Sequence, residues 1–303
     1  MRTIPLVDLS QFEQGNLAQR NEFIETLGNA FHTVGFVGVV NHGIPSELIK
    51  SFYKEANAFF ALSEKEKLTY KIPGANGQRG YTAFGTEHAK QSKVADLKEF
   101  FQIGNEGNIA VSEIPSFLNL GENLYREFER AGSGLLQAIA LHLHLPVDYF
   151  DQRIKNGTSI LRAIHYPPIT QEPASAIRAE QHEDINLITL LVGASAGGLE
   201  LLSKEGEWLP IVPEADEIVI NVGDMLQRLT NNYLRSTTHR VVNPPREEWH
   251  LPRLSIPFFL HPRPEMDLSC LENCISDKNP LHFEPITAGA YLDERLREIG
   301  LKK

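Results

Sequence analysis

The second half of this chain is a succession of short strand-like segments, and this pattern limits the folds that the chain can adopt. Runs rich in β-branched residues recur at close intervals, with glycine, proline and asparagine between them. We place these runs at residues 158–166, 187–192, 198–202, 208–212, 217–222, 239–242 and 253–260. Many short strands separated by turn signals predict a β-sandwich or a β-barrel. A chain of 303 residues is long enough to give such a domain a sizeable core.

The first half has the periodicity of helices. Apolar residues recur at spacings of three and four in segments 17–34 and 118–143, and Ser63 followed by Glu66 is a helix-start signal. We also expect a helix after Pro45, a helix from Ala288 to Ile299 capped by Gly300, strands at 4–9 and 37–40, and irregular structure over 73–95.

Composition excludes several classes of protein. The hydrophobic and charged contents, 42% and 22%, are those of a soluble globular protein, and a net charge of −10 argues against a general nucleic-acid or anionic-membrane surface. No apolar run approaches the ~20 residues that span a bilayer, and no signal-peptide core is evident. Cys270 and Cys274 form no disulfide framework and have no nearby histidine, so we expect a reducing cytoplasm and no cysteine metal site.

One short motif has the spacing of a metal site. His182 and Asp184 are two residues apart, so on a strand they would point to the same face, and His239 follows 57 residues after His182. Two histidines and one carboxylate form the facial triad that binds non-haem Fe(II) and leaves coordination positions open. A structural zinc site would instead be closed by four ligands rich in cysteine. The spacing therefore predicts an iron site built from His182, Asp184 and His239.

A second pair of residues predicts an anion pocket. Arg253 and Ser255 are also spaced by two, within a segment that continues as Ile256, Phe258 and Phe259. A guanidinium inside an apolar strand needs a partner, and its planar fork suits a carboxylate. An arginine reaching out from a strand edge is the alternative.

Together these residues resemble the isopenicillin N synthase-like branch of the Fe(II)/2-oxoglutarate-dependent oxygenases, over most of the chain. The catalytic half carries the resemblance in residues 182–189, in Leu229 to Tyr233 leading to His239, and in Arg253 to Ser255. The N-terminal half carries it in residues 4–9 and 35–45, where Val37 replaces the second phenylalanine of the family's GFF segment.

The resemblance implies roles for individual residues. His182, Asp184 and His239 would be the iron ligands, while Arg253, Ser255 and Tyr166 would hold the distal carboxylate of 2-oxoglutarate. Many members have asparagine two residues before that tyrosine, where this chain has Ile164.

Three further residues are candidates for substrate binding. Arg162 would share a strand face with Ile164 and Tyr166, either as a second anion contact or as a surface arginine. Arg79 and Tyr81 lie in a segment that covers the iron in this branch, and the resemblance suggests that they contact a substrate carboxylate.

The resemblance also implies an architecture. We expect an α+β protein with a double-stranded β-helix, or jelly-roll, core between an N-terminal helical and β region and a C-terminal helix. The expected regions are 1–115 (N-terminal dioxygenase-type region), 116–150 (long supporting helix), 155–265 (catalytic core) and 266–303 (C-terminal extension and helix).

The expected activity is that of an Fe(II)/2-oxoglutarate-dependent dioxygenase. Such an enzyme couples oxidative decarboxylation of 2-oxoglutarate to hydroxylation, desaturation or cyclisation of a small molecule, using O₂ and, as an open possibility, ascorbate. Some members keep the Arg-x-Ser pair without using 2-oxoglutarate, so an oxidase of the isopenicillin N synthase type is the alternative. A non-catalytic metal-binding sensor ranks lower. We expect a monomer that binds neither nucleic acid nor membrane.

Overall fold

The computed structural model describes residues 3–88, 94–193, 195–214, 216–299 and 301–302. The strands are β1 (Leu6–Asp8), β2 (Phe36–Val40), β3 (Gly80–Thr82), β4 (Glu99–Gly104), β5 (Ile160–Tyr166), β6 (Ala179–His182), β7 (Ile188–Val192), β8 (Leu199–Leu202), β9 (Trp208–Pro210), β10 (Ile218–Val222), β11 (His239–Val241) and β12 (Arg253–Leu260). The helices are α1 (Leu9–Glu13), α2 (Leu17–Thr33), α3 (Ser46–Phe60), α4 (Glu64–Leu68), α5 (Ser116–His142), α6 (Asp151–Ile154), α7 (Asp224–Leu229), α8 (Ala288–Glu298) and the 3-10 turns η1 (Arg246–Glu248) and η2 (Glu272–Cys274).

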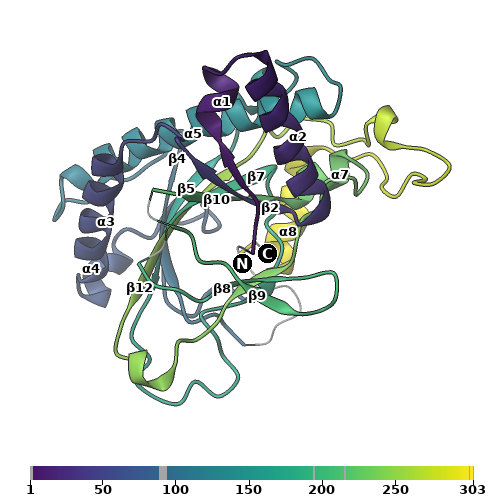
Figure 1. Cartoon of the computed structure of the whole chain (residues 1–303). Coiled ribbons are helices and arrows are strands. Elements are labelled where there is room, and N and C mark those ends of the chain that lie inside the picture. The colour runs from purple at the N-terminus through teal and green to yellow at the C-terminus, as the bar shows by residue number, and fades with distance from the viewer. Residues whose placement is uncertain (1–2, 89–93, 194, 215, 300, 303) are drawn as a thin grey trace.

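Within these ranges the strands form two sheets, and the protein is of mixed α and β structure (Figure 1). The larger sheet has the order β1-β2-β10-β7-β12-β5-β4-β3, and the smaller has the order β6-β11-β8-β9. Neighbouring strands are antiparallel except β1 and β2, which are parallel. Strands β1 to β4 extend the larger sheet on both sides of the strands that follow residue 158, so the N-terminal region is part of the same sheet.

Two hydrophobic clusters hold these layers together. One cluster lies between the larger sheet and the helices α2, α3 and α5; in it Phe128 of α5 stacks on Phe258 of β12 with ring centroids 5.5 Å apart. The second cluster lies between the two sheets and includes Ile164 of β5 and Leu201 of β8. The larger sheet is therefore covered by helices on one face and by the smaller sheet on the other (Figure 1).

The long helix α5 lies close against this sheet because it presents a glycine to it. A Cβ atom added at Gly132 would lie 2.4 Å from Cδ1 of Leu260, the last residue of β12. No side chain fits at that distance, so the glycine sets how closely the helix packs against β12 and β7.

Most of the elements expected from the sequence are present. The strand-like runs from 158 to 260 all contain strands, and the two long helices begin and end within two residues of the expected bounds. Ser63 forms the expected capping box with Glu66 at the start of α4. The expected cap Gly300 and residues 89–93 of the expected irregular segment lie outside the described residues.

The sequence patterns missed several short elements. The segment 73–95, expected to be irregular, contains β3, which pairs with β4 at the edge of the larger sheet. Strand β6 was not expected as a strand of its own because its sequence Ala-Glu-Gln-His has no β-branched or aromatic residue. Pairing with β11 creates it. Within the described part of the chain, no helix has the length and apolar character needed to cross a membrane.

Candidate metal centre

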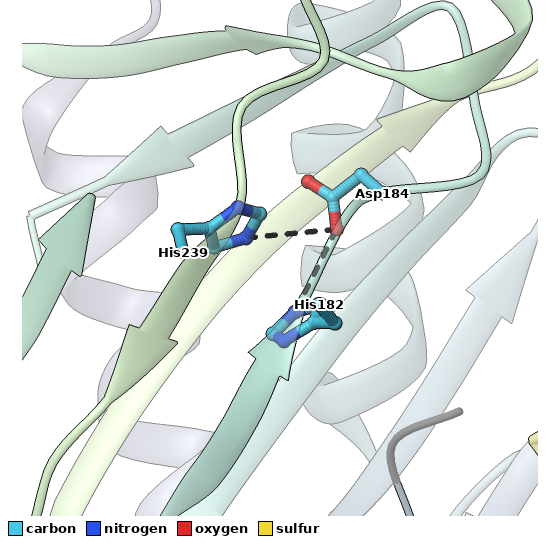
Figure 2. Close-up of side chains that lie close together, drawn as sticks. All are labelled: His182, Asp184 and His239. Atoms are coloured by element: carbon cyan, nitrogen blue, oxygen red, sulfur yellow. Dashed lines mark ion pairs between the residues drawn. The ribbon is translucent and has the colours of Figure 1, made fainter. Parts of the chain in front are cut away.

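His182, Asp184 and His239 come together between the two sheets (Figure 2). His182 is the last residue of β6, His239 is the first of β11, and the antiparallel register places them directly opposite each other. Oδ1 of Asp184 lies 4.0 Å from Nε2 of His182 and 3.9 Å from Nε2 of His239. One ligand atom from each side chain lies within 4.8 Å of the others, which is the spacing of a shared metal ion.

Backbone carbonyls orient both imidazoles in the same way. Nδ1 of His182 is 2.7 Å from the carbonyl oxygen of Glu180, and Nδ1 of His239 is 3.1 Å from that of Thr237. A carbonyl oxygen can only accept, so the proton of each ring lies on Nδ1 and the lone pair of Nε2 is left for a metal. Burial lowers the pKa of His182, and the neighbouring His239 adds to this effect, which keeps the ring neutral as a ligand must be.

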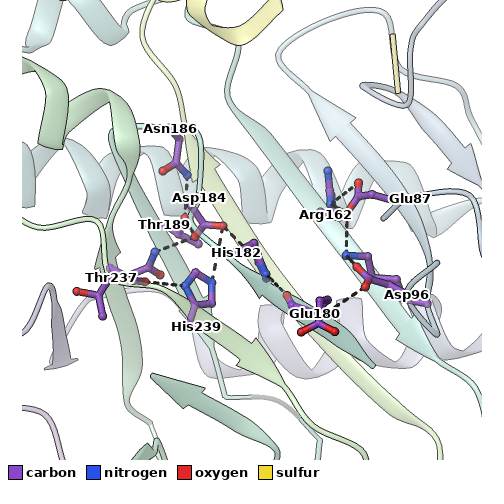
Figure 3. A network of polar contacts seen from close by, with 12 residues as sticks. Glu87, Asp96, Arg162, Glu180, His182, Asp184, Asn186, Thr189, Thr237 and His239 are labelled. Carbon is purple, nitrogen blue, oxygen red and sulfur yellow. Dashed lines mark hydrogen bonds and ion pairs between the residues drawn. The ribbon is translucent and has the colours of Figure 1, made fainter. Parts of the chain in front are cut away.

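Asp184 is fixed by the larger sheet. Its Oδ2 accepts hydrogen bonds from Thr189 Oγ1 of β7 at 2.5 Å and from Asn221 Nδ2 of β10 at 2.8 Å (Figure 3). Burial acts to raise the pKa of Asp184, but the two histidines and these two hydrogen bonds more than offset it, so the pKa is lowered. The carboxylate therefore presents Oδ1 to the histidines in its charged form.

The three side chains lie in a cavity of about 440 Å³. Both sheets line it, and Leu292 and Leu296 of helix α8, together with Ile299 just after the helix, form part of its wall. The inward-pointing residues of β12 follow one another along the cavity at spacings of two, from Arg253 and Ser255 through Pro257 and Phe259.

Arg253 and Ser255 occupy one end of this cavity together with Tyr166. The guanidinium carbon of Arg253 lies 5.0 Å from the ring centroid of Tyr166, which is its partner in the β12–β5 register. Nε of Arg253 donates to the carbonyl oxygens of Ala196 and Gly197, while Nη1 is buried without a hydrogen-bond partner. A buried guanidinium nitrogen without an acceptor suits an anionic ligand at this end.

A second buried arginine, Arg178, lies near enough to Arg253 for their charges to interact, although it does not line the cavity, and the sequence patterns missed it. Arg178 is 2% exposed, its Nη2 donates to the carbonyl oxygen of Leu251, and its Nε has no hydrogen-bond partner. Burial lowers the pKa of Arg178, and the positive charge of Arg253 adds to this effect, while Tyr166 and Glu248 act in the opposite direction. Among the described residues neither arginine has a carboxylate within ion-pair distance, so both charges favour a bound anion.

Arg162 lies in the cavity wall, but it is already paired. Its Nη1 lies 3.3 Å from Oε2 of Glu87, and its Nε donates to Gln102 Oε1 at 2.8 Å. Glu87 also pairs with Lys98 at 2.7 Å, and Lys98 pairs with Asp96 at 2.8 Å (Figure 3). Arg162 is thus neither a surface arginine nor an unpaired cation.

The structure does not bring Arg79 and Tyr81 to the cavity. Arg79 donates to the carbonyl oxygens of Gln78 and Glu106, and Tyr81 donates to Oε2 of Glu99 at 2.5 Å. Neither side chain lines the cavity wall.

Three further residues that the sequence patterns did not assign to the site, His261, Glu87 and Lys98, line the cavity. His261 continues the spacing of two that runs from Arg253 to Phe259, and it lines the cavity. Glu87 and Lys98 lie in the segment expected to cover the metal, but nothing in the sequence pairs them with each other or with Arg162. Ile164, which replaces the asparagine found in many relatives, packs in the cluster between the sheets.

The donor set fits a redox-active divalent metal. Two imidazoles and one carboxylate leave coordination positions open, and this combination is typical of non-haem Fe(II). Cys270 and Cys274 are free thiols away from this centre.

Two family models match the chain. The N-terminal model of the non-haem dioxygenases, described as "non-haem dioxygenase in morphine synthesis N-terminal", matches residues 4–118, and that of the 2OG-Fe(II) oxygenase superfamily matches residues 157–262. Among curated proteins, the 2-oxoglutarate-dependent dioxygenase frbA of Dothideomycetidae sp. is 33% identical, with 80% of each chain covered. Proline hydroxylase buaE of Petromyces alliaceus is 31% identical over 96% of this chain and 97% of its own.

Solved structures agree with this match. A putative 2OG-Fe(II) oxygenase family protein from Caulobacter crescentus is 41% identical with a TM-score of 0.88, covering 99% of this chain and 100% of its own. A full-length protein of Neurospora crassa, solved in complex with alpha-KG, is 30% identical with a TM-score of 0.87, covering 97% of this chain and 96% of its own.

Proposed function

This chain belongs to the 2OG-Fe(II) oxygenase superfamily and is an Fe(II)/2-oxoglutarate-dependent dioxygenase, and from that premise we propose that His182, Asp184 and His239 are its iron ligands. The observation that carries this proposal is the convergence of two Nε2 lone pairs and one carboxylate oxygen in a single cavity. Bound Fe(II), 2-oxoglutarate and O₂ supply an oxidation that yields succinate and CO₂ and oxidises the substrate.

We propose that Arg253, Ser255 and Tyr166 bind the distal carboxylate of 2-oxoglutarate. The buried, unpartnered Nη1 of Arg253 supports this role, and Arg178 adds a second buried positive charge nearby. Arg253, Ser255 and Tyr166 lie on β12 and β5, whereas His182 and His239 lie on β6 and β11. The co-substrate would therefore be held at one end by Arg253, Ser255 and Tyr166, with its other end directed at the metal.

The protein residues hold and orient the reacting groups. Thr189 and Asn221 keep the carboxylate of Asp184 turned toward the histidines, and the backbone carbonyls of Glu180 and Thr237 hold both imidazole protons on Nδ1.

We further propose that the two facing sheets form a double-stranded β-helix, or jelly-roll, core. The two sheets with the metal ligands between them support this proposal. The division into 1–115, 116–150, 155–265 and 266–303 is also proposed, with the qualification that β1 to β4 contribute strands to the core sheet.

We propose a small-molecule substrate that is hydroxylated, desaturated or cyclised. The relatives include a proline hydroxylase, and the Neurospora crassa protein has been solved with thymine, which supports a small substrate without naming this one. A net charge of −10 supports the absence of a nucleic-acid or membrane surface, and the two free thiols support a reducing cytoplasm.

One experiment tests the metal and co-substrate assignments together. Fe(II) and 2-oxoglutarate are added to metal-free protein under anaerobic conditions, and the visible charge-transfer band of a chelated keto acid is measured before O₂ is admitted and succinate is assayed. His182→Ala, Asp184→Ala and His239→Ala should each lose iron, and retention of iron by any one of them removes that residue from the site. Full iron loading without a band or succinate would instead favour the 2-oxoglutarate-independent oxidase.

A further inference from the structure

The wall of the cavity beyond the metal ligands has the features of a substrate-binding site. The inward-pointing residues of β5 and β12 continue past the Arg253 end to Ile160, Arg162, Phe259 and, one residue past the strand end, His261. In the β5–β12 register Ile160 pairs with Phe259, so these residues form one continuous surface.

This wall carries charges that balance one another. Glu87 lies between Arg162 and Lys98, and Lys98 also pairs with Asp96. Burial acts to raise the pKa of Glu87, but the charges of Lys98 and Arg162 hold it at about 2, so the carboxylate is ionised at neutral pH. Among the described residues of this wall, two cations therefore face two carboxylates, and a substrate carboxylate placed against them would add an uncompensated buried charge.

Contacts hold the guanidinium of Arg162 in one position and leave its Nη2 available. Its guanidinium lies 4.2 Å from the ring centroid of Phe100 and 5.1 Å from that of Phe259, its Nε is bound to Gln102, and its Nη1 faces Glu87. Nη2 makes no hydrogen bond to the described part of the chain. Since a guanidinium can only donate, Nη2 is available to an acceptor on the substrate.

His261 supplies a complementary group. The residue is 5% exposed and lines the cavity, and its buried Nδ1 has no hydrogen-bond partner among the residues that the structure describes. Burial lowers the pKa of His261 to about 4, so the ring is neutral near pH 7. A neutral imidazole has one donor and one acceptor, and a buried group of this kind gains from a polar partner.

We propose that the substrate carries an uncharged amide, lactam or imide group that docks against Arg162 and His261. Its carbonyl oxygen accepts from Nη2 of Arg162, and its adjacent polar edge pairs with the imidazole of His261. This inference rests on the proposed function, because it assigns this wall to the substrate of the oxygenase. It also explains why the site would reject substrates with a carboxylate at this position, because the charges of the cavity wall are already balanced.

Three probes test the selection directly. Protein loaded with Mn(II) and 2-oxoglutarate, which binds without turnover, is titrated calorimetrically with benzamide, with uracil as a cyclic imide and with benzoate as the isosteric anion of benzamide. We expect both amide probes to bind, and benzamide to bind roughly tenfold more tightly than benzoate. Failure of both amide probes to bind, or equal affinity for benzoate, overturns the proposal.

Substitutions at His261 separate its role from the general shape of the cavity. His261→Phe keeps a ring but removes both nitrogens and should weaken amide binding by roughly tenfold without changing benzoate binding. His250→Phe, the same change at an exposed histidine outside the cavity, should leave all three affinities unchanged. His261→Asn retains a donor and an acceptor and should keep most of the amide affinity. The assignment is contradicted if His261→Asn loses as much amide affinity as His261→Phe, or if His261→Phe loses none.

The charge balance has its own test. Glu87→Gln leaves the wall with an excess positive charge and should raise benzoate affinity by roughly threefold or more, so an unchanged benzoate affinity argues against the balance. The anaerobic Fe(II)/2-oxoglutarate charge-transfer band is recorded for every variant. A normal band with failed amide selection overturns this inference alone, whereas absence of the band from the wild-type protein counts against the proposed function.

Discussion

Replacing Lys98 with methionine should strongly destabilise the protein, because two buried carboxylates depend on its charge. Lys98 is 7% exposed, and its Nζ lies 2.7 Å from Glu87 and 2.8 Å from Asp96. Methionine has a similar length and no charge, so the substitution removes the cation without leaving a large cavity. Among the ion pairs of the described residues, Glu87 then keeps the longer contact to Arg162.

The size of the effect follows from two considerations. Removal of one partner from a buried ion pair typically costs about 3–5 kcal/mol, because the remaining charge stays buried. The pKa of Glu87 is lowered to about 2 because the charges of Lys98 and Arg162 more than offset its burial, which shows that this carboxylate depends on its cations. We therefore expect a loss of about 3 kcal/mol or more in the free energy of unfolding.

Urea denaturation of the wild-type protein and of Lys98→Met measures this loss. Lys50→Met is the matched control, because Lys50 pairs with Glu47 at 2.8 Å while both side chains are largely exposed. Exposed pairs contribute little, so the control should unfold like the wild type. A loss in Lys98→Met no greater than that in Lys50→Met would refute the argument that this cluster is a buried, interdependent set of charges.

The same cluster predicts a dependence on pH. Glu87 has a lowered pKa in the folded protein, so its stabilisation is fully present above about pH 4.5 and is lost as the pH falls toward about 2. The difference in unfolding free energy between wild type and Glu87→Gln should therefore shrink between pH 6 and pH 3. A difference that stays constant over this range would contradict an ionised Glu87.

Three further substitutions test other contacts. Arg253→Gln should raise the half-saturating 2-oxoglutarate concentration by roughly 30-fold, measured by the charge-transfer band, because a buried charge partner typically contributes 2–5 kcal/mol; an unchanged value would remove Arg253 from the co-substrate site. Asn221→Ala should weaken iron binding by about 10- to 100-fold, since it removes one of the two hydrogen bonds to Oδ2 of Asp184, and equal metal affinity in a competition assay would speak against that support. Gly132→Ala should destabilise the protein by about 1–3 kcal/mol through its clash with β12, whereas Gly134→Ala in the same helix meets no atom closer than 3.5 Å and should not; equal thermal midpoints would contradict the close packing.

The sequence was sufficient to predict the candidate metal ligands, because two of them are close together in the chain. Only Glu183 separates His182, the last residue of β6, from Asp184, and the strands that carry His239 and Arg253 are recognisable by their own patterns. Long helices and buried strands were likewise predictable, since a repeated hydrophobic period is a property of the sequence.

Short elements and pairings depended on tertiary structure. Strand β6 has no strand-forming residue, yet it pairs with β11 and so brings His182 opposite His239. Glu87 and Arg162 are 75 residues apart, and only the approach of their segments in the folded chain brings them together.

The sequence by itself determined which family this protein belongs to and which residues are its candidate ligands: their types, their spacing and the strand that carries Arg253. Only the tertiary structure decided the environment of that chemistry, including the neutralised wall around Glu87 and the unpartnered ring of His261. The physical reason is that a ligand type is a property of one residue, whereas burial, charge balance and the absence of a partner belong to the set of residues that surround it.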